Sequence, residues 1–570
     1  MLRECIEVFN KIYAERGESL ITDSYELEQG DYFIIKKDGD FEHIKIGKNI
    51  DSSSVEKYDY LAERDYYSNL LDMNKPVDKA KQIHSNNYLS FFIKNNVLNE
   101  KKDTLDEIIK KYYEILKNPF LKYDKGEKKR VYEELEKQLG KPDAEKIEKN
   151  YQWIKNNLYS LKEKTKDSKN YLKIFFDEDL EKYKKESKRY IIPNIYNNTN
   201  YNVKLDDKTY GLPNDNLNLN TKKPYLENKT RKKNYTVPYL LNEEEVFQQK
   251  KFFDYLYNLS NRRIRNVYIT DEKIIPLKSN EILENNISGY FLRIRKDKNE
   301  AAIERFDVIP RYKEEIYPVI KITDCLNDEI KTKLEYGNII NSKKQLAGML
   351  NDFLFKGKMF GIIYEIIKDM RIFDARLKFV ANTYKDVFYK LVVKGETESF
   401  LKVYKTIFLE YIKYSLATQE YKAEAYDLYN FMSSIEGGKK LELHEGIREK
   451  FRKVFKNGEG IIENKDEYFF AIGQLIYFLL YKKRETIKNH DEINKFLNLR
   501  DTEQLKFEIR KAFIKYNYDI RMQNKRFNLL YEMVLGYIPE NSKIDYDRLL
   551  GGYLSSSLIY EKNEDEKEEN

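Results

Sequence analysis

Few residues of this chain have the types and spacing that catalysis requires. Its 570 residues include only four histidines and two cysteines, Cys5 and Cys325, which is too few for a zinc site of several cysteines. The sequence contains no GxxxxGK[ST] loop, no GxGxxG after a strand and no HExxH. His490-Asp491 is a single His-Asp dipeptide, and a metal phosphohydrolase built on such a dipeptide needs further His and Asp ligands. We therefore predict no catalytic residue, no metal site and no cofactor.

Three basic clusters suggest contact with nucleic acid instead. The first spans residues 211–238, where six basic residues and one acid, Glu227, lie between Lys222 and Tyr235. Its prolines predict an extended chain, and alternate side chains of an extended chain can follow a phosphate backbone. Asparagines at every second position offer donors and acceptors to base edges. A solvated loop whose asparagines reflect AT-rich codons is the alternative.

The second cluster, residues 72–92, places basic residues such as Lys75 ahead of Asn86 and Asn87. The aromatic and aliphatic run 88–93 that follows predicts an anchor in a core. The pattern therefore predicts an exposed polar tip on a rigid base, as a loop that reads a groove would need.

The third cluster is a basic stripe near the end of the chain. At 100° per residue, Lys511, Lys515, Lys525 and Arg526 fall on one face of a single predicted helix, opposite the apolar stripe 505–530. A solvated helix face is the alternative to a nucleic-acid surface.

Proline placement indicates the elements that carry these clusters. Seven of the eleven prolines lie in residues 193–318, and none lies between Pro318 and Pro539. Because proline inside a helix costs about 3 kcal/mol, the long run without proline predicts a helical domain. Apolar residues recur at helical spacing over 400–412, and the apolar stretch 468–481 predicts the buried centre of a bundle.

The first half of the chain is predicted to be mixed. A helix is expected from Leu2 to Tyr13, followed by a hairpin that turns at Asp38-Gly39. Helices interrupted at Pro119 and Pro142 are expected in the region 103–190. Further strands are expected at 267–270, 290–295 and 301–309.

These patterns together predict an α+β protein: a mixed α/β amino-terminal and central region with β-hairpins, then a carboxy-terminal all-α helical bundle. The expected domains are 1–205, a proline-rich basic region 206–325, the bundle 326–560, and a disordered acidic tail 561–570. The formal net charge is +7, and no apolar stretch is long enough to span a bilayer. We expect a cytoplasmic protein without a membrane partner.

Two stretches resemble a known family. LLDMNKPVDKAKQIHSNNYLSFFIK (70–94) and YGLPNDNLNLNTKKPYLENKTRK (210–232) are similar to the large subunit of type I-B CRISPR Cascade complexes, and the similarity extends over most of the chain. The resemblance implies a non-catalytic subunit that contacts the 5′ handle of the guide RNA and reads the protospacer-adjacent motif in duplex DNA. It also implies that the subunit stabilises the R-loop and that a separate helicase–nuclease is recruited.

The resemblance assigns roles only to matching positions. It implies contacts to the guide-RNA handle or the motif-proximal duplex for Lys75, Asn86 and Asn87. It implies backbone and adjacent-motif contacts for Asn220, Lys222, Lys223, Arg231 and Lys232. The basic stripe would suit the displaced single strand, a prediction from charge alone.

The helical domain resembles the family's small-subunit module, which an internal start codon can yield as a separate protein; Met349, Met359 and Met370 are candidate starts. The expected partners are guide RNA, target double-stranded DNA, the displaced strand, other Cascade subunits and the helicase–nuclease. The alternatives are a stand-alone nuclease with an unrecognised active site and a structural protein whose basic patches are only solvated surface.

Overall fold

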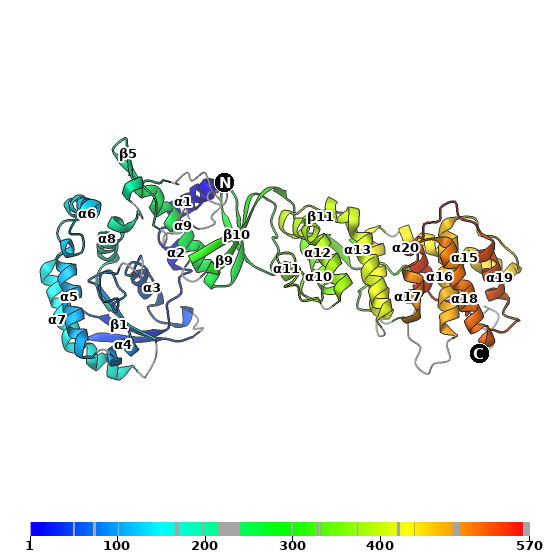
Figure 1. Ribbon diagram of the computed structural model, residues 1–570, viewed down its shortest axis with the longest axis horizontal. Helices are drawn as coiled ribbons and strands as arrows, with labels where there is room; N and C mark the ends of the chain where they lie inside the picture. Colours follow the sequence, from blue (N-terminus) through cyan, green and yellow to red (C-terminus); the bar gives the residue numbers. More distant parts are fainter. Residues whose placement is uncertain are drawn as a thin grey trace. The chain divides into compact units, whose positions relative to one another are not determined.

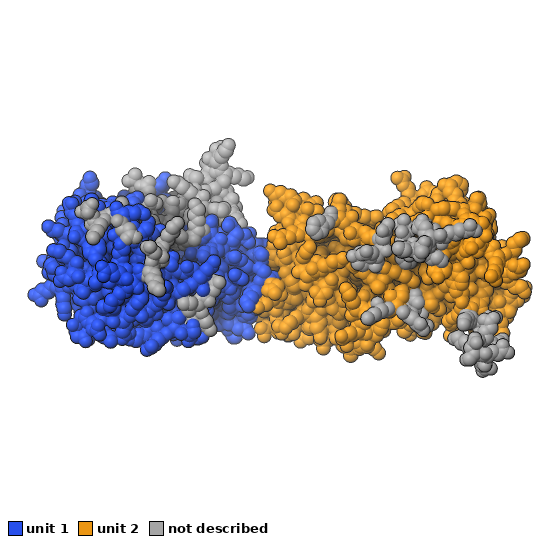
Figure 2. All heavy atoms as spheres, turned by 90° about the horizontal axis from the view of Figure 1, so that it is seen from below, with its two compact units in different colours: residues 1–279, 289–309 blue, residues 280–288, 310–570 orange. Residues whose placement is uncertain are grey.

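The chain folds into two compact units. The computed structural model describes residues 2–48, 52–71, 76–100, 102–165, 170–196, 199–214, 240–297, 300–326, 330, 332–372, 374–418, 422–437, 439–482 and 491–561. Unit 1 comprises residues 1–279 and 289–309, and unit 2 comprises residues 280–288 and 310–570 (Figure 2). The fold is α+β, as the sequence predicts. The division differs from the expected domains, since neither 205/206 nor 325/326 separates the units.

Unit 1 contains a four-stranded sheet, which includes β1 in Figure 1. Its strand order is β2–β1–β4–β3. Its strands are β1 (Gly30–Ile35), β2 (Phe41–Ile46), β3 (Ser90–Lys94) and β4 (Tyr171–Phe176). β1 and β4 are parallel, while β2 and β3 pair antiparallel with β1 and β4. The predicted hairpin is confirmed, and Gly39 has the positive φ of 91° that suits such a turn. The sequence patterns did not indicate β4, because its apolar run is buried on both faces and does not alternate.

Helices cover this sheet. The helices of unit 1 are α1 (Leu2–Arg16), α2 (Ser19–Thr22), α3 (Tyr58–Tyr66), α4 (Asn95–Glu100), α5 (Lys102–Lys117), α6 (Gly126–Leu139), α7 (Ala144–Lys164), α8 (Leu180–Ile191) and α9 (Glu243–Asn261). Side chains of α5 and α7 share one apolar core with the sheet. The predicted breaks are confirmed: Pro119 opens a 3-10 turn after α5, and the Asp143 side chain caps α7 by accepting a hydrogen bond from the Lys146 amide at 3.0 Å.

A second sheet completes unit 1, with the order β10–β9–β7–β8. Its strands are β7 (Ile264–Ile269), β8 (Ile274–Lys278), β9 (Ile287–Asp297) and β10 (Glu300–Tyr312), and β5 (Val203–Leu205) pairs separately with β6 (Lys208–Tyr210). The three strands expected here are confirmed as β7, β9 and β10. Helix α9, which was not predicted, packs with α1 against β7. Its capping box of Asn242 and Glu245 is a local signal that sequence reasoning missed.

Unit 2 is helical apart from a two-stranded sheet at its start. Its elements are β11 (Glu315–Lys321), β12 (Ile339–Ser342), α10 (Lys343–Phe353), α11 (Met359–Ile362), α12 (Ala375–Tyr389), α13 (Glu398–Ala417), α14 (Lys422–Ile435), α15 (Lys439–Asn457), α16 (Lys465–Tyr481), α17 (Asn494–Leu497), α18 (Thr502–Tyr516), α19 (Lys525–Gly536) and α20 (Tyr546–Leu554). Helix α16 is buried against α18, α19 and α20, which confirms the predicted centre of the bundle (Figure 1).

One prediction for the end of the chain was wrong, and the predicted disordered tail is tested only at Glu561. The single helix expected over 505–530 is two helices, because Asn524 starts α19 by accepting a hydrogen bond from the Phe527 amide at 3.0 Å. Glu561, expected to begin a disordered tail, accepts a hydrogen bond from Arg452 Nη2 at 2.7 Å; residues 562–570 lie outside the described part of the chain. Among the described helices, none is long and apolar enough to cross a membrane.

Candidate nucleic-acid interface

The first basic cluster is described only at its ends. Asn220, Lys222, Lys223, Arg231 and Lys232 lie outside the residues that the structure describes. On either side of them, the backbones of Gly211 and Leu241 exchange two hydrogen bonds of 3.0 Å. Asn214 donates from Nδ2 to the carbonyl oxygen of Asn194 at 3.0 Å. The segments before and after residues 215–239 are therefore hydrogen-bonded to each other. Asn214 links the first of these segments to Asn194.

The prediction of an exposed polar tip in the second cluster is wrong. Asn86 and Asn87 are 2% and 0% exposed. The side-chain amide of Asn87 bonds within the fold: it donates to the Tyr183 carbonyl at 3.0 Å and accepts from the Leu89 amide at 3.1 Å. The fold buries both residues because the loop that carries them leads directly into β3. Lys75 lies outside the described residues.

Asn86 instead lines a small hollow in unit 1. Segments distant in sequence build it: the loop after α3, the turn after α5, and the end of α8 with the 3-10 turn that follows. Its lining residues are Leu70, Leu71, Val77, Asn86, Lys122, Tyr190 and Asn194. The enclosed part has room for about one water-sized group. The hollow therefore adjoins both residues 70–94, which include Asn86, and residues 210–232, whose Asn214 contacts Asn194.

Two buried polar atoms of this lining, Asn86 Oδ1 and the Tyr190 hydroxyl, have no hydrogen-bond partner among the residues that the structure describes. The orientation of the Asn86 amide is fixed by its nitrogen, because Nδ2 donates to the Asn69 carbonyl at 2.7 Å. Only the NH₂ group can bond to a carbonyl oxygen, so the atom without a partner is the amide oxygen. Tyr190 is 5% exposed. Because buried polar atoms are normally hydrogen-bonded, a polar group in this hollow would satisfy both of them.

Lysines gather at the same place. Lys122 lines the hollow and donates to the Pro76 carbonyl, and Lys128 Nζ donates to Asn194 Oδ1 at 2.6 Å. Burial, and then repulsion by Lys128 and Lys79, lowers the pKa of Lys122 to about 8. Phosphate would be attracted to this group of like charges. Sequence reasoning missed it, although the run from Lys122 to Arg130 contains five basic residues.

The predicted stripe in unit 2 is not one surface of one helix. Lys511 and Lys515 lie on α18, whereas Lys525 and Arg526 begin α19. Lys511 Nζ lies 2.8 Å from Glu508, and Arg526 donates to the backbone carbonyls of Leu558 and Glu561. These contacts give Arg526 a structural role.

Lys515 is also held by an acid. Its Nζ lies 2.9 Å from Glu492 Oε1, and the Tyr516 hydroxyl donates to Glu492 Oε2 at 2.6 Å. Partial burial would raise the pKa of Glu492, but the hydrogen bonds from Tyr516 and Lys515 outweigh it and lower the pKa to about 2. The charges of Lys511 and Lys515 are thus partly neutralised by neighbouring acids. This weakens the prediction that the basic stripe binds nucleic acid.

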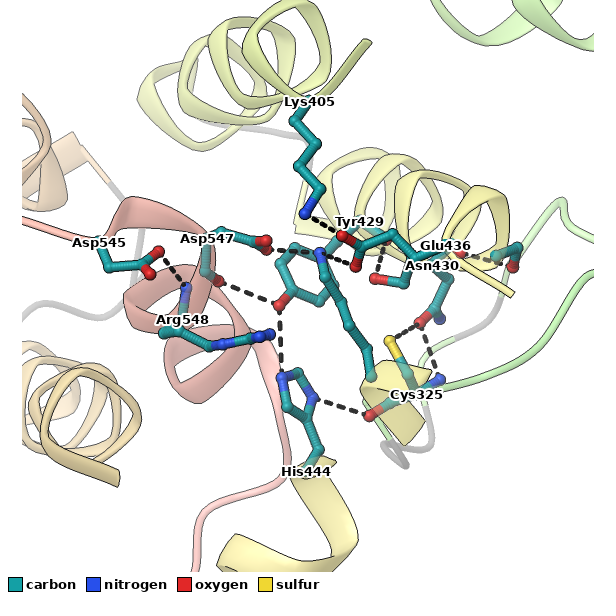
Figure 3. Close-up of polar contacts among 12 residues, drawn as sticks. Cys325, Lys405, Tyr429, Asn430, Glu436, His444, Asp545, Asp547 and Arg548 are labelled. Carbon is teal, nitrogen blue, oxygen red and sulfur yellow. Dashed lines mark hydrogen bonds and ion pairs between the residues drawn. The ribbon is translucent and has the colours of Figure 1, made fainter. Parts of the chain in front are cut away.

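A group of titratable side chains in unit 2 is shown in Figure 3. His444 is fully buried; its Nδ1 donates to the Cys325 carbonyl at 3.1 Å, and its Nε2 lies 3.4 Å from the Tyr429 hydroxyl. That hydroxyl donates to the Asp547 carbonyl at 3.0 Å. The Cys325 amide donates to Asn430 Oδ1 at 3.0 Å. These bonds connect the loop after β11 with α14, α15 and α20.

Ion pairs extend the same group. Lys440, 1% exposed, lies 2.6 Å from Asp547 Oδ1 and 3.3 Å from Glu436 Oε2, and Glu436 also pairs with Lys405. Burial lowers the pKa of Lys440 despite the attraction of Asp547. The contacts between these helices and the loop after β11 thus bring Lys440, His444 and Cys325 together. Lysine, histidine and cysteine are residue types that catalysis uses.

The packing of this group supports a structural role. A Cβ added at Gly551 would lie 2.4 Å from the Tyr429 hydroxyl and 2.7 Å from His444 Cε1, so no substrate group fits there. Burial raises the pKa of the Cys325 thiol to about 12, which keeps it protonated and a poor nucleophile. Over the described ranges, no three His, Cys, Asp or Glu side chains are grouped to hold a metal. His490 lies outside those ranges.

The chain has no match among the protein-family models, the curated proteins or the solved structures with which it was compared.

Proposed function

We propose that this protein is the non-catalytic large subunit of a type I-B CRISPR surveillance complex. In this role it contacts the guide RNA 5′ handle, recognises the protospacer-adjacent motif in duplex DNA, stabilises the R-loop and recruits the helicase–nuclease. Its partners are guide RNA, target DNA with its displaced strand, and the other Cascade subunits.

One observation carries the proposal: the two stretches that resemble this family meet in the fold. Asn86 and Asn214 are separated by more than 120 residues in sequence, yet one lines the hollow and the other bonds to Asn194 in its lining. Lys122 lines the hollow and Lys128 bonds to Asn194 in its lining. These two lysines supply positive charge for contacts to a phosphate backbone. Convergence of separate motifs on a basic site favours a shared ligand over two unrelated solvated loops.

A pull-down from the native operon tests the assembly. Carboxy-terminally tagged protein is expected to co-purify with RNA of uniform length and with several further subunits. Purification as a lone chain without RNA would refute the proposal. Metal-dependent cleavage of DNA or RNA by the purified chain would refute its non-catalytic part and favour the nuclease.

Charge reversal tests the site. Lys122→Glu and Lys128→Glu together are expected to weaken RNA binding, and the slope of log affinity against log salt should become shallower by about 0.7 for each lost contact to a single strand. Lys110→Glu with Lys137→Glu is the matched control, because these two residues of α5 and α6 do not line the hollow. Equal losses in both double variants would show a nonspecific charge effect and move the site elsewhere.

A further inference from the structure

The unpartnered atoms of the hollow restrict what it can bind. Asn86 Oδ1 carries no proton and needs a donor, whereas the Tyr190 hydroxyl can donate or accept. Phosphate oxygens only accept hydrogen bonds in the ionised backbone, so a DNA backbone cannot satisfy Asn86. A hydroxyl can do so, because it donates one hydrogen bond and accepts others.

We propose that the hollow takes a ribose 2′-hydroxyl of an RNA strand, which donates to Asn86 Oδ1 and accepts from the Tyr190 hydroxyl. This inference rests on the proposed binding of guide RNA, and it names the contact by which the protein would distinguish RNA from DNA. The 2′-hydroxyl is the group that distinguishes the two backbones. An RNA strand satisfies both buried atoms, whereas a DNA backbone offers no donor to Asn86 Oδ1.

Size and charge agree with this occupant. The enclosed space suits one hydroxyl and excludes a nucleobase. Lys122 lines the hollow, and Lys128 and Lys79 are near enough to act on its charge. The phosphates on either side of a seated ribose would meet these ammonium groups, so one nucleotide engages both parts of the site.

Tyr190→Phe removes one hydroxyl and tests the contact with little other change. We would measure binding of the full chain to a labelled single-stranded RNA 12-mer, to DNA of the same sequence and to its 2′-O-methyl RNA. The wild type is expected to bind RNA more tightly than the other two. Tyr190→Phe should lower RNA affinity roughly 3- to 10-fold, as loss of one hydrogen bond does, and leave DNA affinity unchanged.

Tyr113→Phe is the matched control. Tyr113 is a buried tyrosine of the same unit whose hydroxyl also has no partner in the described part of the chain, and it does not line the hollow. Its variant should bind RNA and DNA as the wild type does. Thermal unfolding of both variants shows whether either change alters the fold.

The outcomes separate this inference from the proposed function. RNA binding that Tyr190→Phe does not change, or that it changes equally for RNA and DNA, overturns the 2′-hydroxyl contact and leaves the proposed function standing. A lower melting temperature for Tyr190→Phe with an unchanged RNA-to-DNA ratio would indicate an ordered water as the occupant and also overturns it. A wild-type chain that binds neither RNA nor DNA overturns both.

Discussion

Acid should destabilise unit 2 through His444. The imidazole is fully buried, and burial, with the nearby charges of Lys440 and Arg548, lowers its pKa from the ordinary 6.5 to about 4 despite the hydrogen bond to Cys325. The folded state therefore resists protonation of this ring. In the unfolded chain the ring takes up a proton as the pH falls below 6.5.

The sign and size of the effect follow from these two pKa values. Above pH 6.5 the ring is neutral in both states and costs nothing. As the pH falls from 6.5 towards 4, only the unfolded state gains a proton, so the free energy of unfolding decreases. With the two values above, the loss is about 2 kcal/mol at pH 5.

His444→Asn removes the titrating ring and keeps an amide donor near the position of Nδ1, which bonds to the Cys325 carbonyl. The variant should be less stable than the wild type at pH 8, because it loses ring packing against Phe470 and Tyr429. Between pH 8 and pH 5 this difference should shrink by about 2 kcal/mol, since only the wild type pays the protonation penalty.

Urea unfolding at both pH values measures the difference. Circular dichroism follows the helices, and the fluorescence of Trp153, the only tryptophan of the chain, follows unit 1 as an internal reference. A wild-type-to-variant difference that is the same at pH 8 and pH 5 would refute the reasoning. It would mean that His444 titrates normally and that the packing around it opens readily.

Three further predictions concern unit 2. Lys440→Met should lower stability by about 3–5 kcal/mol, because it removes the buried cation that lies 2.6 Å from the Asp547 carboxylate; Lys344→Met, which breaks an exposed pair, should leave the same urea titration almost unchanged. Gly473→Ala should cost about 1–3 kcal/mol, since its Cβ would lie 2.2 Å from a carbonyl of α20, whereas Gly446→Ala meets no atom within 4 Å and should leave the melting temperature unchanged or higher. A product that starts at Met359 lacks the segment that bonds to Asn430 and His444, so it should melt below a fragment of unit 2 that begins at residue 310; equal melting temperatures would contradict this.

Local signals in the sequence determined much of the secondary structure. The hairpin needs only a turn at Asp38-Gly39, and the helix ends near Pro119 and Pro142 need only a residue that cannot continue a helix. The buried centre of the bundle was evident because α16 is apolar on all sides. The break between α18 and α19 was missed, because the apolar spacing continues across it and only the cap at Asn524 marks the new helix.

The candidate site depended far more on tertiary structure. From sequence, Asn86 is a polar residue near lysines, and nothing local indicates that the fold buries it with one amide oxygen unpaired. Lys122, Tyr190 and Asn194 come from separate segments that only the packing of α5, α8 and the first sheet brings together. Charge and polarity belong to each residue and can be read in order, whereas burial and proximity arise from contacts between distant parts of the chain. The sequence therefore determined where the basic segments of this protein lie, and the tertiary structure decided which of its polar atoms are buried without a partner among the described residues.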